Sequence, residues 1–151
     1  MLTRRATLQL FATAPVAYAI ATPAFAATDP VYQEGGIAVD GSDVVAYFTE
    51  GKPVAGTAAH TVDWNGATWQ FSSAEDAEAF QANPEAYAPQ YGGYCAWAAA
   101  EGYIAGTRRD AWTIHEGKLY LNFNKRIRRR WERDIPGNVT RGDANWPAIL
   151  A

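Results

Sequence analysis

Two stretches of the chain alternate between apolar and polar residues, and each has a turn-forming pair at its centre. Within residues 60–71 the pair is Asn65-Gly66, the strongest short-range signal of a β-hairpin. Within residues 112–123 the pair is Glu116-Gly117. Because side chains of a strand point alternately to its two sides, each hairpin is expected to have one buried and one polar face.

The alternation also predicts which side chains share a face. In the first hairpin it places Trp64 opposite Ala67, Val62 opposite Trp69 and His60 opposite Phe71, so that His60 is expected to point at the core. In the second hairpin it predicts an apolar face and a polar face, with His115 in solvent. The predicted apolar residues are Trp112, Ile114, Leu119, Leu121 and Phe123, and the predicted polar ones are Thr113, His115, Lys118, Tyr120 and Asn122.

Helical segments lie between and after the hairpins. A helix is predicted over residues 72–80, with Ser72 as N-cap and Glu75 completing a capping box. Further helices are predicted from Tyr94 to a stop at Gly102, and after an N-cap at Asn124. Residues 44–48, an apolar run, are predicted to form a strand. The expected fold is a small single α+β domain with two β-hairpins and three or four short helices.

The first 26 residues have the character of an export signal. Arg4 and Arg5 precede a mildly apolar stretch that ends in Ala24-Phe25-Ala26, a small-x-small cleavage pattern. The arginine pair favours the twin-arginine translocation route and a periplasmic location. The expected organisation is a cleaved signal peptide at 1–26, a linker at 27–37, and a domain with a C-terminal extension at 38–151.

Charge narrows the choice of partner. Arg4 and Arg5 are the only charged residues among 1–26, so cleavage leaves 11 basic and 16 acidic side chains and changes the net charge from −3 to −5. An acidic domain is a poor binder of nucleic acid. The expected partners are a metal ion or a periplasmic protein, with no nucleic acid and no stable membrane span after cleavage.

Cys95 is the only cysteine, so it cannot form a disulfide within the chain. It is therefore buried, ligating, reactive or paired with another chain. Its place in the first turn of a predicted helix favours a thiolate, because the helix N-terminus lowers a thiol pKa. The alternative is structural, since a free cysteine in an alanine-rich helix also acts as a small buried hydrophobe.

His60 is the second candidate, because an imidazole on an apolar face needs a hydrogen-bond partner or a metal. A backbone carbonyl would serve as well as a metal. If His60 and Cys95 meet, one nitrogen and one sulfur suit a soft ion such as Cu(I). Tyr91, Tyr94 and Asp43 are weaker further donors, and no other cofactor is expected. A Cys95–His60 catalytic pair stays open, but no recognised catalytic motif is present, so a non-enzyme is expected.

Residues 59–87, from the histidine strand to the Asn83-Pro84-x-x-Tyr87 ending, resemble the YHS-domain family of metal-handling modules. Ala59-His60-Thr61 takes the place of the family's Tyr-His-Ser. The similarity extends over about residues 38–147 to an exported subgroup in which selenocysteine matches Cys95. Cysteines of the metal-type modules are replaced here by Ser72 and Asp76.

The resemblance implies metal handling and a functional role for Cys95. The leading hypothesis is therefore an exported YHS-like domain that binds copper through Cys95 and His60. The alternatives are a redox-active thiol protein that uses Cys95, and a non-catalytic interaction module in which the cysteine is structural.

Overall fold

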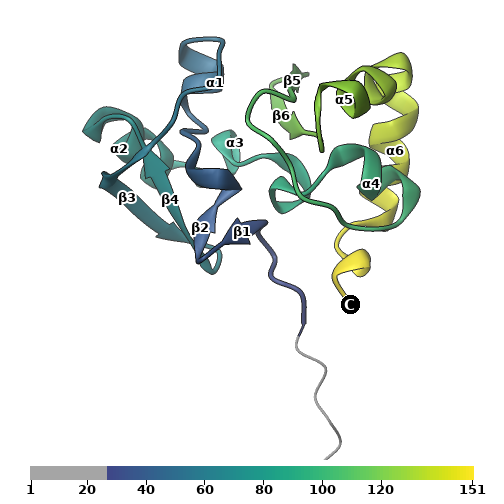
Figure 1. The fold of residues 1–151 in the computed structure, drawn as a ribbon, viewed down its shortest axis with the longest axis horizontal. Coiled ribbons are helices and arrows are strands. Elements are labelled where there is room, and N and C mark those ends of the chain that lie inside the picture. The colour runs from purple at the N-terminus through teal and green to yellow at the C-terminus, as the bar shows by residue number, and fades with distance from the viewer. Residues whose placement is uncertain (1–26) are drawn as a thin grey trace, which may run out of the picture.

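A four-stranded sheet and a separate two-stranded hairpin organise residues 27–151, the part of the chain that the computed structural model describes (Figure 1). The predicted signal peptide, residues 1–26, lies outside these residues. The strand order of the larger sheet is β1-β2-β4-β3. Its strands are β1 (Gln33–Glu34), β2 (Ile37–Ala38), β3 (Thr57–Trp64) and β4 (Ala67–Phe71), and the hairpin consists of β5 (Trp112–His115) and β6 (Lys118–Leu121).

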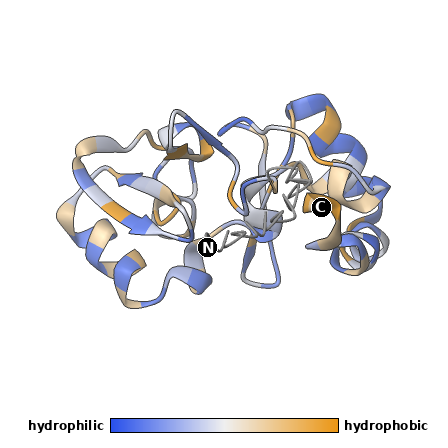
Figure 2. Cartoon of the chain, turned by 90° about the horizontal axis from the view of Figure 1, so that it is seen from below, coloured by the Kyte–Doolittle hydropathy of each residue, from blue (hydrophilic) through white to orange (hydrophobic). Residues whose placement is uncertain are grey.

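Short helices complete the predicted α+β fold, which is confirmed. They are α1 (Ala46–Thr49), α2 (Ala74–Ala82), α3 (Pro84–Tyr87), α4 (Ala96–Glu101), α5 (Lys125–Trp131) and α6 (Ile135–Asn145). In Figure 1, α1 and α2 accompany the larger sheet, whereas α4, α5 and α6 surround the hairpin in the other half. The helices carry both hydrophilic and hydrophobic residues (Figure 2). Within residues 27–151 no helix has the length and hydropathy needed to cross a bilayer.

The first hairpin has the predicted turn and, near it, the predicted register. Val62 pairs with Trp69 and Trp64 with Ala67. An irregularity between Thr57 and Thr61 then shifts the pairing, so that Thr57 rather than His60 lies opposite Phe71. The predicted partner of His60 is therefore wrong, because alternation assumes a regular ladder, whereas here the four steps from Thr57 to Thr61 lie opposite the single step from Phe71 to Gln70, which leaves three extra residues on β3.

The second hairpin also has the predicted register, but its two faces are used differently. Ile114 pairs with Leu119 and Trp112 with Leu121. Leu119 and Leu121 are buried as expected, yet Tyr120 and Asn122 on the predicted polar face are also buried. Phe123, predicted to be buried, is 48% exposed. β6 is thus covered on both sides.

Two hydrophobic clusters explain this arrangement. The first cluster joins the larger sheet, α1 and α2 to one side of β6, and it contains Trp69, Phe71, Phe80, Leu119 and Leu121. The second cluster joins α4, α5 and α6 to the other side of β6, and it contains Tyr91, Ala96, Ala99, Tyr120 and Trp131. The single strand β6 therefore contributes side chains to both hydrophobic clusters.

Three local predictions are corrected. Residues 44–48 are not a strand, because the chain turns into α1 at Ala46. The N-cap of α2 is Ser73, whose side chain accepts from the Asp76 N–H, and not Ser72. The range 27–37 is more than a linker, since it contains β1 and the start of β2 and buries Val31.

Asp43 explains the first two corrections. It is fully buried, and its Oδ1 accepts from the N–H groups of Val45 and Ala46 at 3.0 and 3.2 Å. Its Oδ2 accepts from the N–H and the hydroxyl of Ser72 at 2.9 and 2.8 Å. One carboxylate therefore begins α1 and at the same time holds the segment between β4 and α2.

Asp76 lies close to this carboxylate. Partial burial, followed by hydrogen bonding and repulsion from Asp43, raises the pKa of Asp76 to about 6. A carboxyl group whose pKa is higher in the folded than in the unfolded chain stabilises the fold when protonated. Its contribution is complete below about pH 4, the pKa of an unfolded aspartate, and is lost as the pH rises through about 6.

Asp43→Ala is expected to lower the free energy of unfolding by about 3 kcal/mol, because buried N–H groups lose their acceptor. Urea unfolding followed by tryptophan fluorescence measures the loss. Asp63→Ala is the matched control, since the exposed Asp63 accepts only from the Thr68 hydroxyl, and about 0.5 kcal/mol is expected there. Equal losses in the two variants would show that Asp43 does not organise the fold.

Asp76→Asn is expected to stabilise the protein by about 1 kcal/mol at pH 7.5, because it removes a half-exposed charge next to Asp43. The gain should vanish at pH 3.5, where the wild-type carboxyl is protonated. Unfolding curves at both pH values measure it. Glu78→Gln, at an exposed carboxylate of the same helix, controls for general charge removal, and a gain independent of pH would contradict the raised pKa.

Candidate functional site

Cys95 occupies the N-cap position of α4, at the helix start that the sequence predicted. Its residue is 1% exposed, and its N–H donates to the Ala105 carbonyl at 2.9 Å. Its own carbonyl accepts from the Ala99 N–H at 2.9 Å, which closes the first turn. The backbone of Cys95 thus holds α4 to the following loop.

Asn122 is the polar neighbour of the thiol. The Cys95 Sγ donates to Asn122 Oδ1 at 3.6 Å, and the same oxygen accepts from the Trp97 N–H at 3.0 Å. The Trp97 bond sets the orientation of the amide, because a backbone N–H can only donate. Sequence reasoning placed Asn122 in solvent, since alternation along β6 does not reveal that α4 covers it.

Burial raises the pKa of the Cys95 thiol, although nearby backbone N–H groups of Ala98, Phe123 and Trp97 act in the opposite direction. The expected lowering by the helix N-terminus is therefore wrong, because loss of hydration outweighs it. At neutral pH Cys95 is a protonated thiol and a poor nucleophile. This environment favours the structural interpretation over the redox one.

A small apolar cavity of about 230 Å³ lies beside the thiol. Tyr103 and Phe123, which are 51% and 48% exposed, form part of its rim. Its lining residues are Cys95, Trp97, Tyr103, Ala105, Phe123 and Ile127. The Cys95 sulfur is the only soft metal donor in this lining. The phenol of Tyr103 offers an oxygen, which is a harder donor.

His60 lies elsewhere. It is half-buried on β3, which forms the outer edge of the larger sheet. Figure 1 places β3 and α4 in opposite halves of the molecule, so the structure does not bring His60 and Cys95 together. Among residues 27–151, no three His, Cys, Asp or Glu side chains are grouped as a metal site requires. The donors do not fit a shared copper site.

The weaker candidate donors are already engaged. Asp43 accepts the four hydrogen bonds described above. The Tyr94 hydroxyl donates to the Asp29 carbonyl at 2.8 Å, and the Tyr91 hydroxyl donates to Asp143 at 3.0 Å. Burial and the Asp143 carboxylate raise the Tyr91 pKa well above its usual range, so the phenol stays protonated.

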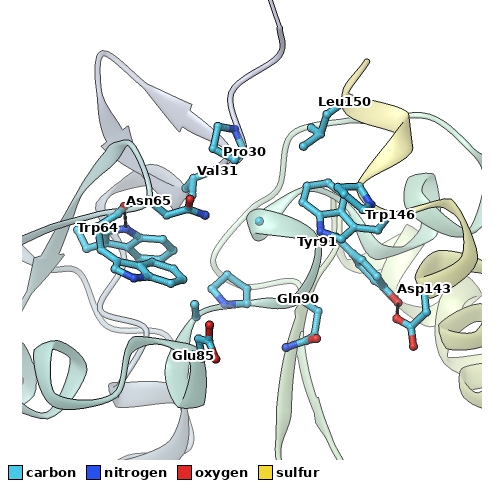
Figure 3. A pocket seen from close by; sticks show the side chains of 15 residues that line it. Pro30, Val31, Trp64, Asn65, Glu85, Gln90, Tyr91, Asp143, Trp146 and Leu150 are labelled. Carbon is cyan, nitrogen blue, oxygen red and sulfur yellow. Dashed lines mark hydrogen bonds between the residues drawn. The ribbon is translucent and has the colours of Figure 1, made fainter.

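A cleft of about 630 Å³ lies between the two clusters (Figure 3). Trp64 and Trp69 reach it from the first hairpin, whereas Tyr91 and Trp146 reach it from the opposite side. Pro30, Val31 and Leu150 add apolar surface. Polar groups are contributed by Asn65, Glu85, Gln90 and Asp143.

Packing holds the aromatic walls in place. The Trp64 and Trp69 ring centroids are 5.8 Å apart, and the Trp69 Nε1–H donates to the Trp64 carbonyl at 3.0 Å. On the other side the centroids of Tyr91 and Trp146 are 6.1 Å apart. Each wall of the cleft therefore contains a pair of aromatic rings that contact each other.

The chain crosses the back of the cleft at Gly92. Its φ is +62°, and a Cβ there would collide with the Pro30 carbonyl. The Gly92 carbonyl accepts from the Tyr32 N–H at 2.9 Å. Only glycine permits this approach, which brings the N-terminal segment against the helix-rich half. The sequence does not reveal the cleft, because its walls come from segments that are distant in the chain.

One comparison with known proteins supplies a match. Residues 45–91 fit the family model of the YHS domain, which is associated with metal handling. No curated protein and no solved structure matches the chain. The matched range begins just before α1 and ends at Tyr91, so it covers the first hairpin, α2 and α3. A YHS domain therefore occupies residues 45–91 of this chain, and it contributes Trp64 and Trp69 to one wall of the cleft and Tyr91 to the other.

Proposed function

We propose that the protein is a non-catalytic binding module that takes a small organic molecule into the cleft. The observation that carries this proposal is the aromatic lining of the cleft. Trp64 and Trp69 from the YHS domain lie on one side and Trp146 on the other, and the cleft has a volume of about 630 Å³. Small-molecule sites are concave, largely apolar and of about 300–1,000 Å³, with a few polar groups for orientation. The cleft has all of these properties.

The chemistry of the lining supports binding rather than catalysis. Its tyrosine, Tyr91, has a raised pKa and donates to Asp143, so it is not a base. Cys95, the strongest nucleophile by residue type, lies in a different cavity and is protonated. In this proposal Cys95 has a structural role at the start of α4, and the signal sequence delivers the folded protein to the periplasm.

Metal handling through Cys95 and His60 is a separate proposal, which the YHS match supports and the geometry does not. A soft ion would have one thiol available beside α4 and would have to displace its proton, because metal ligation requires the thiolate. The imidazole of His60 lies in the other half of the molecule. The cleft therefore has the stronger structural argument.

Trp64→Ala and Trp146→Ala are each expected to weaken ligand binding about five- to thirtyfold, since an aromatic contact with the ligand contributes about 1–2 kcal/mol. Binding is measured by ¹⁵N-NMR titration with small amines, acids, alcohols and sugars. Trp97→Ala is the matched control, because Trp97 lines the Cys95 cavity and not the cleft.

The proposed function is wrong if no compound of these four classes shifts resonances of the cleft. It is also wrong if Trp97→Ala alone removes binding, since the ligand would then occupy the cavity beside Cys95. Retained dispersion of the amide spectrum shows that each variant is folded.

For copper, Cys95→Ala and His60→Ala are expected to differ. If the thiol binds Cu(I), Cys95→Ala removes binding whereas His60→Ala leaves it unchanged, because the two side chains do not share a site. Wild-type affinity should then rise with pH, by up to about tenfold per unit, as the thiol loses its proton. Titration against a chromophoric Cu(I) chelator between pH 6 and 9 measures both effects. Equal losses in the two variants would contradict the separation of the residues.

A further inference from the structure

The charged side chains that line the cleft are both acidic. Glu85 is contributed by α3 of the YHS domain and Asp143 by α6, and the lining contains no lysine, arginine or histidine. In Figure 3 the two carboxylates lie at different sides of the cavity, with the side-chain amide of Gln90 between them. The cleft therefore has a negative potential along its polar side.

The aromatic walls of the cleft also favour a positively charged ligand. The face of an indole or phenol ring is negative, so it attracts a cation placed within about 6 Å of its centre. Trp64 and Trp146, which are partly exposed, line opposite sides of the cleft, and each contacts a buried aromatic ring, Trp69 and Tyr91 respectively. The Tyr91 hydroxyl donates to Asp143, which keeps that carboxylate at the edge of the aromatic wall.

From this combination we infer that the ligand of the cleft is an organic cation with an alkylated ammonium group. The inference rests on the proposed function and specifies its ligand class. The ammonium group lies among the aromatic rings, with Glu85 and Asp143 compensating its charge. The remainder of the ligand contacts Pro30, Val31 and Leu150 on the apolar side.

Other ligand classes fit less well. An anion would meet two exposed carboxylates and no basic side chain in the lining, so it would be repelled. A neutral ligand would cover the carboxylates without supplying a compensating charge. A bare metal ion would find carboxylates on separate elements and aromatic carbon between them, whereas hard cations require six or more oxygens in one shell.

Choline and its uncharged carbon analogue 3,3-dimethylbutan-1-ol test the inference, because they differ in charge and hardly in shape. In ¹⁵N-NMR titrations of the protein without its signal peptide, choline is expected to shift the indole N–H resonances of Trp64 and Trp146. The neutral analogue is expected to bind at least tenfold more weakly. Both compounds are smaller than the cleft, so the ratio of the two affinities is the readout rather than their absolute size.

Glu85→Gln tests the role of the protein's own charge, because it removes one carboxylate of the cleft and keeps the size of the side chain. Glu85 is exposed, so the variant is expected to fold, and choline affinity should fall three- to tenfold while that of the neutral analogue stays the same. Glu78→Gln is the matched control, because it removes an exposed carboxylate of α2 that does not line the cleft. Its choline affinity should equal that of the wild type.

The outcomes distinguish this inference from the proposed function. Equal binding of the two compounds, or equal losses in Glu85→Gln and Glu78→Gln, overturns the cationic ligand but leaves a binding cleft. The same conclusion follows if choline fails to bind whereas acids, alcohols or sugars shift the cleft resonances. If no compound of any class shifts them, the proposed function and the inference fall together.

Discussion

Everything in this fold depends on β6 being buried on both sides. Leu119 and Leu121 enter the first cluster, and Tyr120 between them enters the second, where its ring lies 4.9 Å from that of Trp131. A strand shared in this way sets the spacing of the two halves. They meet along β6 and separate beyond it, and the separated part is the cleft with its two aromatic walls.

Buried polar groups have an organising role rather than a chemical one. Asp43 connects α1 to the end of β4 through four hydrogen bonds, and Asn122 connects the thiol of Cys95 to the backbone of α4. Each such group would be costly without its partners. The Asp43 carboxylate is engaged by its four hydrogen bonds, whereas the buried Asn122 Nδ2 has no hydrogen-bond partner among the described residues.

The same reasoning explains how a YHS domain can serve ligand binding. By the resemblance described above, Ser72 and Asp76 take the places of cysteines in metal-type modules. Here Ser72 donates to Asp43, and the neighbouring Asp76 has a raised pKa. The domain instead contributes Trp64 and Trp69 to a surface that the helix-rich half completes. Binding then belongs to the combination of the two halves and not to the YHS residues alone.

The sequence by itself determined the local geometry. Asn65-Gly66 and Glu116-Gly117 adopt positive φ, as the turns require, and α5 begins after Asn124 and α4 ends at Gly102, both where expected. These features depend on residues close together in the chain. Only the tertiary structure decided that Asn122 is buried beside the start of α4, that His60 and Cys95 lie in opposite halves, and that Trp64 faces Trp146. The physical reason is that alternation and capping are local, whereas burial and the meeting of side chains depend on segments that are distant in sequence.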